Sequence, residues 1–361
     1  MKALVLNAIG REFELEDVEI AAPIGREVLV DVQACGLCHT DMLFATNPIF
    51  PTPAVYGHEV SGIVTKVGPE VTQFQVGDHV LGSLAQTCGS CAKCQSGYSF
   101  QCQHPEATLR RPTEAPRLSR RGQSLHQGLG LGGFAERALI HENQLAVLPK
   151  KMPFAQAALL GCGVVTGAGA VLNTANVRTG DTIVIFGAGG VGLNAISGAR
   201  IAGASRIVVI DIQPKRLEAA KKFGATDVID STTTKPVEAV RDLLRGGADH
   251  VFDFVGLKAV AEQGLAMLGV GGGLYLLGVS KPEVNMDLNI FDAIGGQKRV
   301  QGVNFGSTNF KRDIPMYAEL YLQGRMNLDD LVSKRIALRD VNEGYAALKD
   351  GSLNRVVVTS F

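Results

Sequence analysis

Four cysteines lie within fifteen residues of the sequence, and they follow the spacing C-x2-C-x2-C-x7-C: Cys88, Cys91, Cys94 and Cys102. Four thiolates this close together can surround one zinc ion, and a zinc with four sulfur ligands has no open position, so such a site is structural. The bacterial iron–sulfur pattern has a shorter last gap and a proline after its fourth cysteine, whereas Gln103 follows here. A total of seven cysteines is odd and no secretion signal is evident, which disfavours disulfides. We predict structural zinc.

A second candidate site is the glycine-rich string GAGGVG (187–192). It satisfies G-x-G-x-x-G and comprises Gly187, Ala188, Gly189, Gly190, Val191 and Gly192. The string follows the apolar run TIVIF (182–186), which is typical of a buried parallel strand, and it precedes an amphipathic stretch that ends at Gly203. In this context glycines allow a tight turn, a close approach to a pyrophosphate, and close packing of helix on strand. The context favours a dinucleotide site over a glycine-rich turn without a ligand.

Asp211 lies nineteen positions after Gly192, at the end of the predicted strand RIVVID (206–211). A carboxylate in that place can accept hydrogen bonds from the adenosine ribose and repels a 2′-phosphate, so we predict NAD rather than NADP. Leu277 and Val279, at the end of the later predicted strand GGGLYLLGV (271–279), are further candidates for contact with the coenzyme.

The elements that must position these residues indicate two domains, because 361 residues exceed what a single core usually supports. Residues 1–163 are rich in strand patterns separated by Gly and Pro. Residues 164–304 alternate strand and helix patterns, which predicts a doubly wound parallel sheet. Residues 305–361 return to a mixed pattern and end in NRVVVTSF, a predicted strand. The predicted fold class is α/β, with one mostly-β domain and one parallel-sheet domain.

Residues 103–133 interrupt the strand pattern with several prolines and glycines and with five arginines: Arg110, Arg111, Arg117, Arg120 and Arg121. We expect a solvated loop here, and the alternative is a loop that contacts substrate.

Charge and hydropathy exclude some classes of partner. The formal net charge is zero, so no basic field attracts nucleic acid or an anionic membrane surface. We find no run of 18 or more apolar residues, and we expect no membrane span. The first residues are predicted to form a strand rather than a signal peptide, and we expect a cytoplasmic location.

The strings GLCHTD (36–41), GHEVSGIVTKVG (57–68), GCGVVTG (161–167) and FGAGGVGL (186–193), together with the cysteine-rich lobe and the C-terminal strand, resemble the zinc-dependent alcohol dehydrogenases of the medium-chain dehydrogenase/reductase superfamily. The resemblance covers essentially the whole chain. It implies a GroES-like catalytic domain made of 1–163 and 305–361, wrapped around a Rossmann NAD-binding domain, 164–304. It also implies a catalytic zinc held by Cys38, His58 and Cys162, with Glu59 behind the metal as a transient ligand. Two zinc ions per chain are therefore expected.

The same resemblance implies further roles. Asp41 would orient His58, and Thr40 would hydrogen-bond the substrate oxygen. Coenzyme contacts are implied for four positions: His39, Thr166, Arg216 and Arg355. One position departs from the family, because the histidine that completes a proton relay in the better-studied animal enzymes is Leu43 here. We expect the proton to leave through water or His39. We assign no role to Cys35.

Two thiolates and one imidazole leave one position of a tetrahedral zinc open, where an alcohol loses its proton more easily because the metal is a Lewis acid. Hydride then passes to the nicotinamide. Apolar side chains predict a pocket for hydrophobic primary alcohols and their aldehydes; they belong to Leu84, Leu277 and the 43–50 stretch. The expected alcohols are aromatic, allylic or medium-chain. A glutathione adduct is a less favoured substrate, to be held by the arginines of 110–121.

Two alternatives remain open at the level of the sequence. One is a nicotinoprotein that retains its NAD and passes electrons to another acceptor. The other is a non-catalytic nucleotide-binding protein on the same scaffold. The resemblance further implies a homodimer or homotetramer, and we expect GGGLYLLGV (271–279) and RVQGVNF (299–305) to be the edge-pairing strands.

Overall fold

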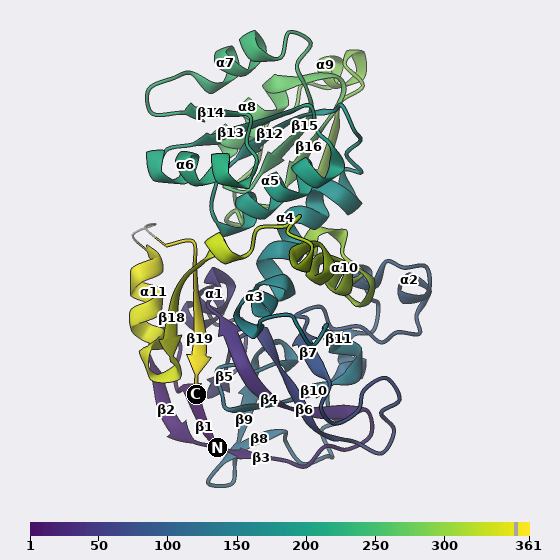
Figure 1. Ribbon diagram of the computed structural model, residues 1–361, viewed down its shortest axis with the longest axis vertical. Helices are drawn as coiled ribbons and strands as arrows, with labels where there is room; N and C mark the ends of the chain where they lie inside the picture. Colours follow the sequence, from purple (N-terminus) through teal and green to yellow (C-terminus); the bar gives the residue numbers. More distant parts are fainter. Residues whose placement is uncertain (350–352) are drawn as a thin grey trace. The chain divides into compact units, whose positions relative to one another are not determined.

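The computed structural model describes residues 1–349 and 353–361, and the chain forms two compact units. The first unit combines both parts of the chain that flank the second, namely Met1–Cys162 and Asn309–Phe361 (Figure 1). The second unit is Gly163–Thr308. The domain boundaries predicted from the sequence, after residues 163 and 304, differ from these by one and four residues.

The first unit contains two sheets. One has the strand order β2-β1-β5-β9-β8-β3, and the other has the order β11-β7-β6-β4-β19-β18 with β10 paired to β4. Their strands are β1 (Lys2–Leu6), β2 (Phe13–Asp17), β3 (Glu19–Ile20), β4 (Glu27–Gly36), β5 (Ala54–Val55), β6 (Glu59–Val67), β7 (His79–Gly82), β8 (Leu118–Arg120), β9 (Gln123–Gln127), β10 (Arg137–His141), β11 (Leu145–Val147), β18 (Val332–Ala337) and β19 (Arg355–Ser360). The helices of this unit are α1 (His39–Thr46), α2 (Ala92–Gln95), α3 (Phe154–Leu159), α10 (Phe310–Leu322) and α11 (Val341–Lys349).

Strand β4 organises the second of these sheets. It pairs antiparallel with β6, β10 and β19, so a strand from the C-terminal part of the chain lies beside one from the N-terminal part. The predictions of a first strand at the N-terminus and of a last strand in NRVVVTSF are confirmed by β1 and β19.

The arginine-rich segment is a solvated loop only in part: most residues between 103 and 116 are exposed, as predicted, but three of its arginines are paired with carboxylates. Arg110 and Arg117 are both buried and form ion pairs with the buried carboxylate of Glu27, at 2.6 and 2.7 Å. Arg120 pairs with Glu16 at 2.6 Å, and the segment also contributes the paired strands β8 and β9. Three of the five arginines therefore have carboxylate partners in the first unit, which leaves little support for a role in anchoring a glutathione adduct.

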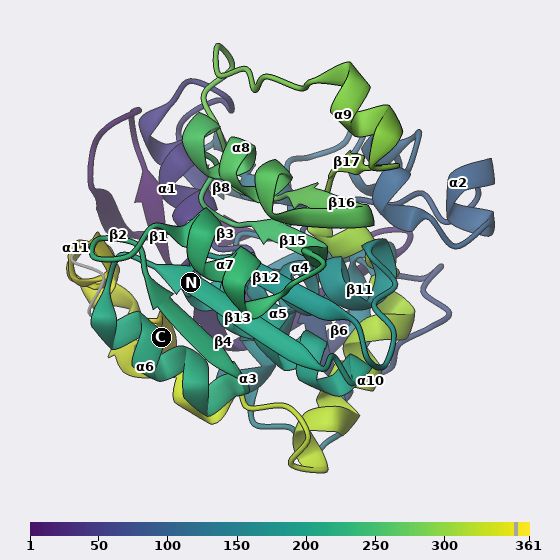
Figure 2. The same cartoon turned by 90° about the horizontal axis from the view of Figure 1, so that it is seen from above.

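The second unit is a six-stranded sheet with the order β14-β13-β12-β15-β16-β17, and every ladder in it is parallel. Figure 2 shows β13, β12, β15 and β16 in succession. Numbered from β12 as strand 1, the order is 3-2-1-4-5-6, which is that of the doubly wound dinucleotide-binding fold. The strands are β12 (Thr182–Phe186), β13 (Arg206–Asp211), β14 (Asp227–Asp230), β15 (Ala248–Asp253), β16 (Leu268–Leu276) and β17 (Arg299–Gly302). The helices are α4 (Val165–Gly169), α5 (Gly190–Ala202), α6 (Pro214–Phe223), α7 (Pro236–Leu243), α8 (Lys258–Met267) and α9 (Ile290–Gly295).

Local sequence explains how the helices of this unit begin and end. Helix α6 has Pro214 in its first turn, where the missing N–H costs nothing, and it ends at Gly224 with a φ of 117°. Helix α5 ends in the same way at Gly203, with a φ of 83°. The buried apolar side chains of β12 and β13, such as Val184 and Val208, lie in the core of the unit. The predicted alternation of buried strands and helices is confirmed.

The prediction that GGGLYLLGV forms a sheet edge is wrong. That run lies mostly in β16, which is paired on both sides, to β15 and to β17. The edge strand is β17, which contains the RVQG part of the other predicted segment, and all four of its residues are exposed. The apolar run therefore lies in an interior strand, with a parallel neighbour on each side.

Within the described residues, one helical stretch is long and apolar enough to cross a membrane by length and composition, namely Phe154–Thr174. Of its apolar window, 83% is buried inside the protein. Burial of this extent is typical of a core helix.

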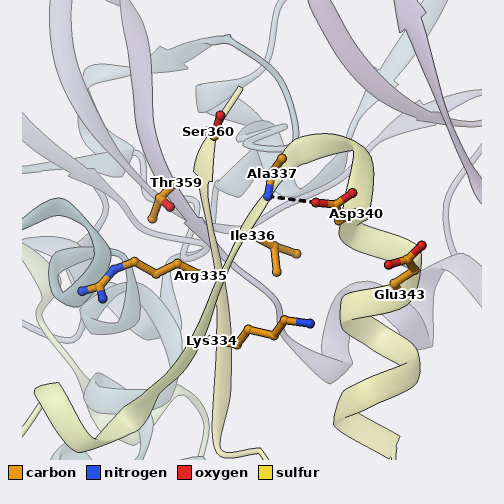
Figure 3. A pocket seen from close by; sticks show the side chains of 8 residues that line it. All are labelled: Lys334, Arg335, Ile336, Ala337, Asp340, Glu343, Thr359 and Ser360. Carbon is orange, nitrogen blue, oxygen red and sulfur yellow. Dashed lines mark hydrogen bonds between the residues drawn. The ribbon is translucent and has the colours of Figure 1, made fainter.

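A surface cavity of about 370 Å³ lies in the first unit beside β18, β19 and α11 (Figure 3). Lys334 extends from β18 toward the helical side, where Asp340 and Glu343 lie, and Arg335 extends in the opposite direction. The N–H of Ala337 donates to Asp340 Oδ2 at 3.3 Å. This cavity contains no residue that the sequence predicts for catalysis, so we assign it no role.

Candidate active site and metal centres

Four predicted site residues come together in the first unit: Cys38, His58, Glu59 and Cys162. One ligand atom from each lies within 4.8 Å of the others, and the two sulfurs are 3.9 Å apart. Cys38, His58 and Glu59 are almost completely buried. A group of soft sulfur and imidazole donors, gathered from segments far apart in the sequence, is the donor set of a catalytic zinc site.

The pairing of β4 with β6 brings two of these segments together. Gly36 at the end of β4 lies opposite Glu59 at the start of β6, so Cys38 and His58 emerge at the same end of the sheet. A Cβ atom on Gly36 would lie 2.2 Å from Glu59 Oε2, which only glycine avoids. The third segment reaches the site through a π-helical stretch, Leu160–Val164, which contains Cys162. Such wide turns often occur at functional sites.

Asp41 contacts His58 as the resemblance implied. Asp41 Oδ1 lies 2.9 Å from His58 Nδ1, and both side chains are buried. The same oxygen accepts a hydrogen bond from the N–H of Gly57 at 3.2 Å. Gly57 has a φ of 95°, and a Cβ atom there would lie 2.6 Å from the backbone nitrogen of Phe134. The glycine is therefore required for the turn that places Asp41 behind the imidazole.

Arg355 lies next to Glu59. Its Nη1 atom is 3.5 Å from Glu59 Oε1, and both side chains are buried. Burial raises the pKa of Glu59 to about 7, although the charge of Arg355 opposes that rise. The resemblance placed Arg355 at the coenzyme, and the neighbour that the structure gives it is the carboxylate beside the cysteines.

The residues of this cluster fit a metal ion. Among the described residues, neither nitrogen of His58 and neither carboxylate oxygen of Glu59 has a hydrogen-bond partner, although all four atoms are buried. The 2.9 Å contact of Nδ1 with Asp41 is close but lacks the geometry of a hydrogen bond. The contact with Cys162 lowers the pKa of Cys38 well below its usual value, and it raises that of Cys162. Burial alone would lower the pKa of His58, but the charges of Asp41 and Cys38 raise it well above its usual value. A divalent cation would satisfy these crowded groups together.

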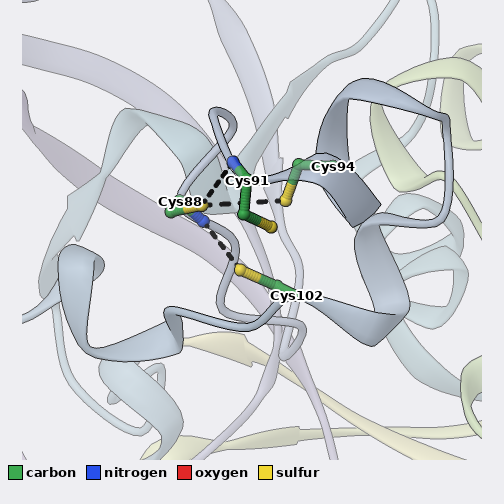
Figure 4. A group of neighbouring side chains, drawn as sticks. All are labelled: Cys88, Cys91, Cys94 and Cys102. Carbon is green, nitrogen blue, oxygen red and sulfur yellow. Dashed lines mark hydrogen bonds between the residues drawn. The ribbon is translucent and has the colours of Figure 1, made fainter.

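The four clustered cysteines form a second group of possible metal ligands, on and around α2 (Figure 4). Cys88 Sγ accepts hydrogen bonds from the N–H groups of Ser90 and Cys91, and Cys102 Sγ accepts them from Cys88 and His104, at 3.2 to 3.4 Å. These bonds outweigh burial and lower the pKa of Cys88 to about 6. Burial instead raises the pKa of Cys94, to about 12, and that of Cys102, so a cation would be needed to keep all four sulfurs as thiolates.

The predicted dinucleotide loop has the expected geometry in the second unit. Gly187 has a φ of 92°, and a Cβ atom on Gly192 would lie 1.9 Å from the carbonyl oxygen of Gly187. Asp211 ends β13, where its carboxylate accepts hydrogen bonds from the N–H groups of Ala188 and Gln213 at 2.8 and 2.9 Å. The carboxylate therefore ties the glycine loop to the second strand.

The other predicted coenzyme residues are divided between the units. His39, at the exposed start of α1, belongs to the first unit with Arg355. Those in the second unit are Thr166 in α4, Gly190 and Val191 in α5, Arg216 in α6, and Leu277 and Val279 after β16. Arg216 Nη1 lies 4.0 Å from Asp211 Oδ2. Thr40 lies in the first turn of α1, two residues after Cys38.

Two family models match the chain: "Alcohol dehydrogenase GroES-like domain" over residues 25–150, and "Zinc-binding dehydrogenase" over residues 190–321. An NDMA-dependent alcohol dehydrogenase of Amycolatopsis methanolica is 36% identical over 365 residues, which is 99% of this chain and 98% of that protein. The chain belongs to the zinc-dependent alcohol dehydrogenases of the medium-chain superfamily. The resemblance seen in the sequence, including the GroES-like and Rossmann folds, is confirmed.

Two other members of this alcohol dehydrogenase family have names that state their own substrates. An S-(hydroxymethyl)glutathione dehydrogenase of Synechocystis is 35% identical over 365 residues, which is 99% of each chain. The crystal structure of a benzyl alcohol dehydrogenase from Acinetobacter calcoaceticus matches with a TM-score of 0.94 and 34% identity, over 100% of this chain and 99% of that one.

Proposed function

We propose that this alcohol dehydrogenase oxidises hydrophobic primary alcohols to aldehydes, reversibly, with NAD as hydride acceptor and a zinc ion held by Cys38, His58 and Cys162. The observation that carries the proposal is the convergence of these three side chains, with Glu59, from segments that are remote in the sequence. When bound, the zinc would act as a Lewis acid on the oxygen of the substrate.

The side chains around the ligands support this assignment. Asp41 holds the Nδ1 side of His58, which leaves Nε2 free to face an ion. Thr40, two residues after Cys38, is the candidate to hydrogen-bond the alcohol oxygen. Leu43 has no titratable group and cannot take part in a proton relay. We therefore infer that the proton leaves through water or through His39, which is exposed.

Asp211 supports NAD as the coenzyme. Its carboxylate is held at the end of β13 by two backbone N–H groups, so it cannot turn away from a ligand without losing both bonds. A 2′-phosphate placed there would meet a negative charge, whereas ribose hydroxyls would meet an acceptor.

Aromatic side chains in α1 and in the segment after it support a hydrophobic substrate. Phe44 contacts both Phe50 and Tyr56, with ring centroids 4.8 and 6.4 Å apart, and Phe50 stacks on His126 at 5.3 Å. The similarity to a benzyl alcohol dehydrogenase points in the same direction. A glutathione adduct is less favoured because Arg110, Arg117 and Arg120 are engaged by carboxylates.

A nicotinoprotein that retains NAD is the second candidate, and it is favoured by the 36% identity to a relative named as NDMA-dependent. Coenzyme that remains with the protein through gel filtration would distinguish it. A non-catalytic nucleotide-binding protein gains no support, because the named relatives are alcohol dehydrogenases.

We further infer a structural zinc at the four-cysteine lobe, which gives two zinc ions per chain. We also infer a homodimer or homotetramer. Its support is the unpaired edge of β17 and the neighbouring helix α9, where Ile290, Phe291 and Ile294 are between 71% and 88% exposed. A cytoplasmic location stays a prediction.

The test is a metal analysis combined with a substrate screen on the purified chain. We expect two zinc ions per chain, and NADH formation with benzyl, cinnamyl, geranyl and hexyl alcohols that exceeds formation with secondary alcohols and is much weaker with NADP. A chain with a single zinc and no alcohol-dependent NADH would contradict the proposal.

A further inference from the structure

Three buried polar atoms belong to residues around His58 and have no hydrogen-bond partner within the described part of the chain. They are Asp41 Oδ2 and the hydroxyls of Tyr56 and Tyr345. The other oxygen of Asp41 is already engaged by Gly57 and His58. Since buried polar groups in native proteins are nearly always paired, directly or through an ordered water, these three atoms require an explanation.

Tyr345 packs against the turn that carries His58. Its ring stacks on Phe13 at 6.2 Å and meets the edge of Phe134 at 6.3 Å. Phe134 in turn lies on that turn, because its N–H donates to the carbonyl of Tyr56 at 2.9 Å, and a Cβ atom on Gly57 would lie 2.8 Å from its ring. The tyrosine is thus held rigidly, with only its hydroxyl unaccounted for.

The preceding residue in α11 packs against the other side of the site. A Cβ atom on Gly344 would lie 2.7 Å from Leu37 Cδ2, and Leu37 is followed directly by Cys38. Helix α11 therefore contacts both the segment that bears Cys38 and, through Phe134, the segment that bears His58. Side chains on this face of α11 can influence both.

The charges around Tyr345 make its hydroxyl a donor. Burial raises the pKa of Tyr345 well above its usual value, and the negative charge of Asp41 raises it further. A phenolic hydroxyl has a proton to donate and a carboxylate oxygen accepts, so Tyr345 and Tyr56 are suitable donors for Asp41 Oδ2.

We propose that the Tyr345 hydroxyl donates, through an internal water shared with Tyr56, to Oδ2 of Asp41, and so positions the imidazole of His58. Tyr345 is then a positioning residue two steps from the metal, and this inference rests on the proposed role of His58 as a zinc ligand. A carboxylate with both oxygens held has one orientation, which sets the direction of His58 Nε2.

The test is the variant Tyr345→Phe, which removes one oxygen and keeps the ring packing against Phe13 and Phe134. The measurement is the rate of zinc transfer from the purified protein to a chromogenic chelator, and the phase that disappears in Cys38→Ser is assigned to the His58 site. We expect that phase to become about tenfold faster in Tyr345→Phe, as for loss of other groups that support metal ligands. The melting temperature should not fall.

The matched control is Tyr317→Phe. Tyr317 is also fully buried in the first unit with an unpaired hydroxyl, but its electrostatic neighbours are Asp313 and Arg312. Its removal should leave the Cys38-dependent phase unchanged. Asp41→Asn should accelerate the same phase, and adding Tyr345→Phe to it should have little further effect, because both act on one contact.

Two results would overturn the inference: an unchanged Cys38-dependent phase in Tyr345→Phe, or an equal acceleration in Tyr317→Phe. If the wild-type protein shows no Cys38-dependent phase at all, the proposed function itself fails, and this inference fails with it.

Discussion

Asp41 Oδ1 and His58 Nδ1 lie 2.9 Å apart in a part of the first unit where both side chains are shielded from water. When Nδ1 of a histidine is held, Nε2 is the nitrogen that can bind a metal ion. The sulfurs of Cys38 and Cys162 and the carboxylate of Glu59 lie close enough to complete such a site. The pair links two sequence motifs, because Asp41 lies in GLCHTD and His58 lies in GHEVSGIVTKVG.

Asp41→Asn should weaken the catalytic centre without unfolding the chain. Loss of a carboxylate behind a ligating histidine typically costs about 10–100-fold in metal affinity or activity. We expect zinc content after dialysis against a chelator, and alcohol-dependent NADH formation, to fall together. Asp313→Asn, which alters another buried aspartate of the same unit, is the control and should leave zinc content unchanged.

Cys94→Ser should remove one zinc ion per chain and lower thermal stability, because the lobe around α2 gathers its four sulfurs with little other buried structure. Metal analysis and the melting temperature provide the check. Cys35→Ala is the comparison: this thiol is fully buried but belongs to neither cluster, so both zinc ions should be retained. Equal metal content in the two variants would contradict a zinc-binding lobe.

Asp211→Asn should relax the choice between NAD and NADP. The amide loses the negative charge and keeps one acceptor oxygen, for the N–H of either Ala188 or Gln213, because its NH2 group cannot accept the other bond. We expect the ratio of kcat/KM for NAD to that for NADP to fall by about tenfold or more, since 1.4 kcal/mol of repulsion is a factor of ten. An unchanged ratio would show that specificity arises elsewhere.

Glu27→Gln should destabilise the first unit strongly. It would leave the buried guanidinium groups of Arg110 and Arg117 without their shared carboxylate, a change that costs about 3–5 kcal/mol for buried pairs. Glu16→Gln breaks a more exposed pair with Arg120 and should cost less than about 1 kcal/mol. Urea denaturation of both variants gives the comparison, and similar losses would argue against the buried pair.

The same carboxylate predicts the acid side of the stability profile. Although burial opposes it, hydrogen bonds and charges from Arg110 and Arg117 lower the pKa of Glu27 below the usual value of a glutamate. A lowered folded-state pKa gives stability that is fully present above the unfolded pKa and is lost as the pH falls through the folded one. Unfolding free energies should therefore fall below about pH 4.5, and less steeply in Glu27→Gln.

Phe291→Glu should disrupt an assembly of subunits while the monomer stays folded. Phe291 is 88% exposed on α9, so a charge there costs the monomer little but would oppose burial against a second copy. Sedimentation velocity should show a lower mass for the variant. The substitution Val76→Glu, at another exposed apolar residue, is the control and should leave the mass unchanged.

Local signals predicted much of this protein from its sequence. The spacing of Cys88 to Cys102 and the TIVIF–GAGGVG–Asp211 series each lie in one short stretch, where geometry follows from the chain itself. The strands β12 and β13 have apolar runs that only a buried parallel sheet explains. Family resemblance supplied the grouping of Cys38, His58 and Cys162, which spacing alone could not.

Contacts between distant segments could not be predicted from local sequence signals. Arg110 and Arg117 lie 83 and 90 residues from Glu27, so their sequence context indicated only a polar loop. The run GGGLYLLGV indicated a strand, but it did not indicate that β17 would pair with that strand on its outer side. Tyr345 has no neighbouring motif, and only the fold places it against Phe134 and the turn before His58.

The π-helical turn at Leu160–Val164 also limits which deletions this part of the chain can tolerate. A π-helical turn is equivalent to one additional residue inserted into an α-helix, which shifts the angular phase of everything that follows. Deleting a single residue, such as Gly161 or Gly163, would let the backbone relax into a regular helix and rotate the Cys162 sulfur away from that of Cys38. The length of this segment is therefore constrained, and so is Gly161, where a Cβ atom would lie 2.9 Å from the carbonyl oxygen of Gly82.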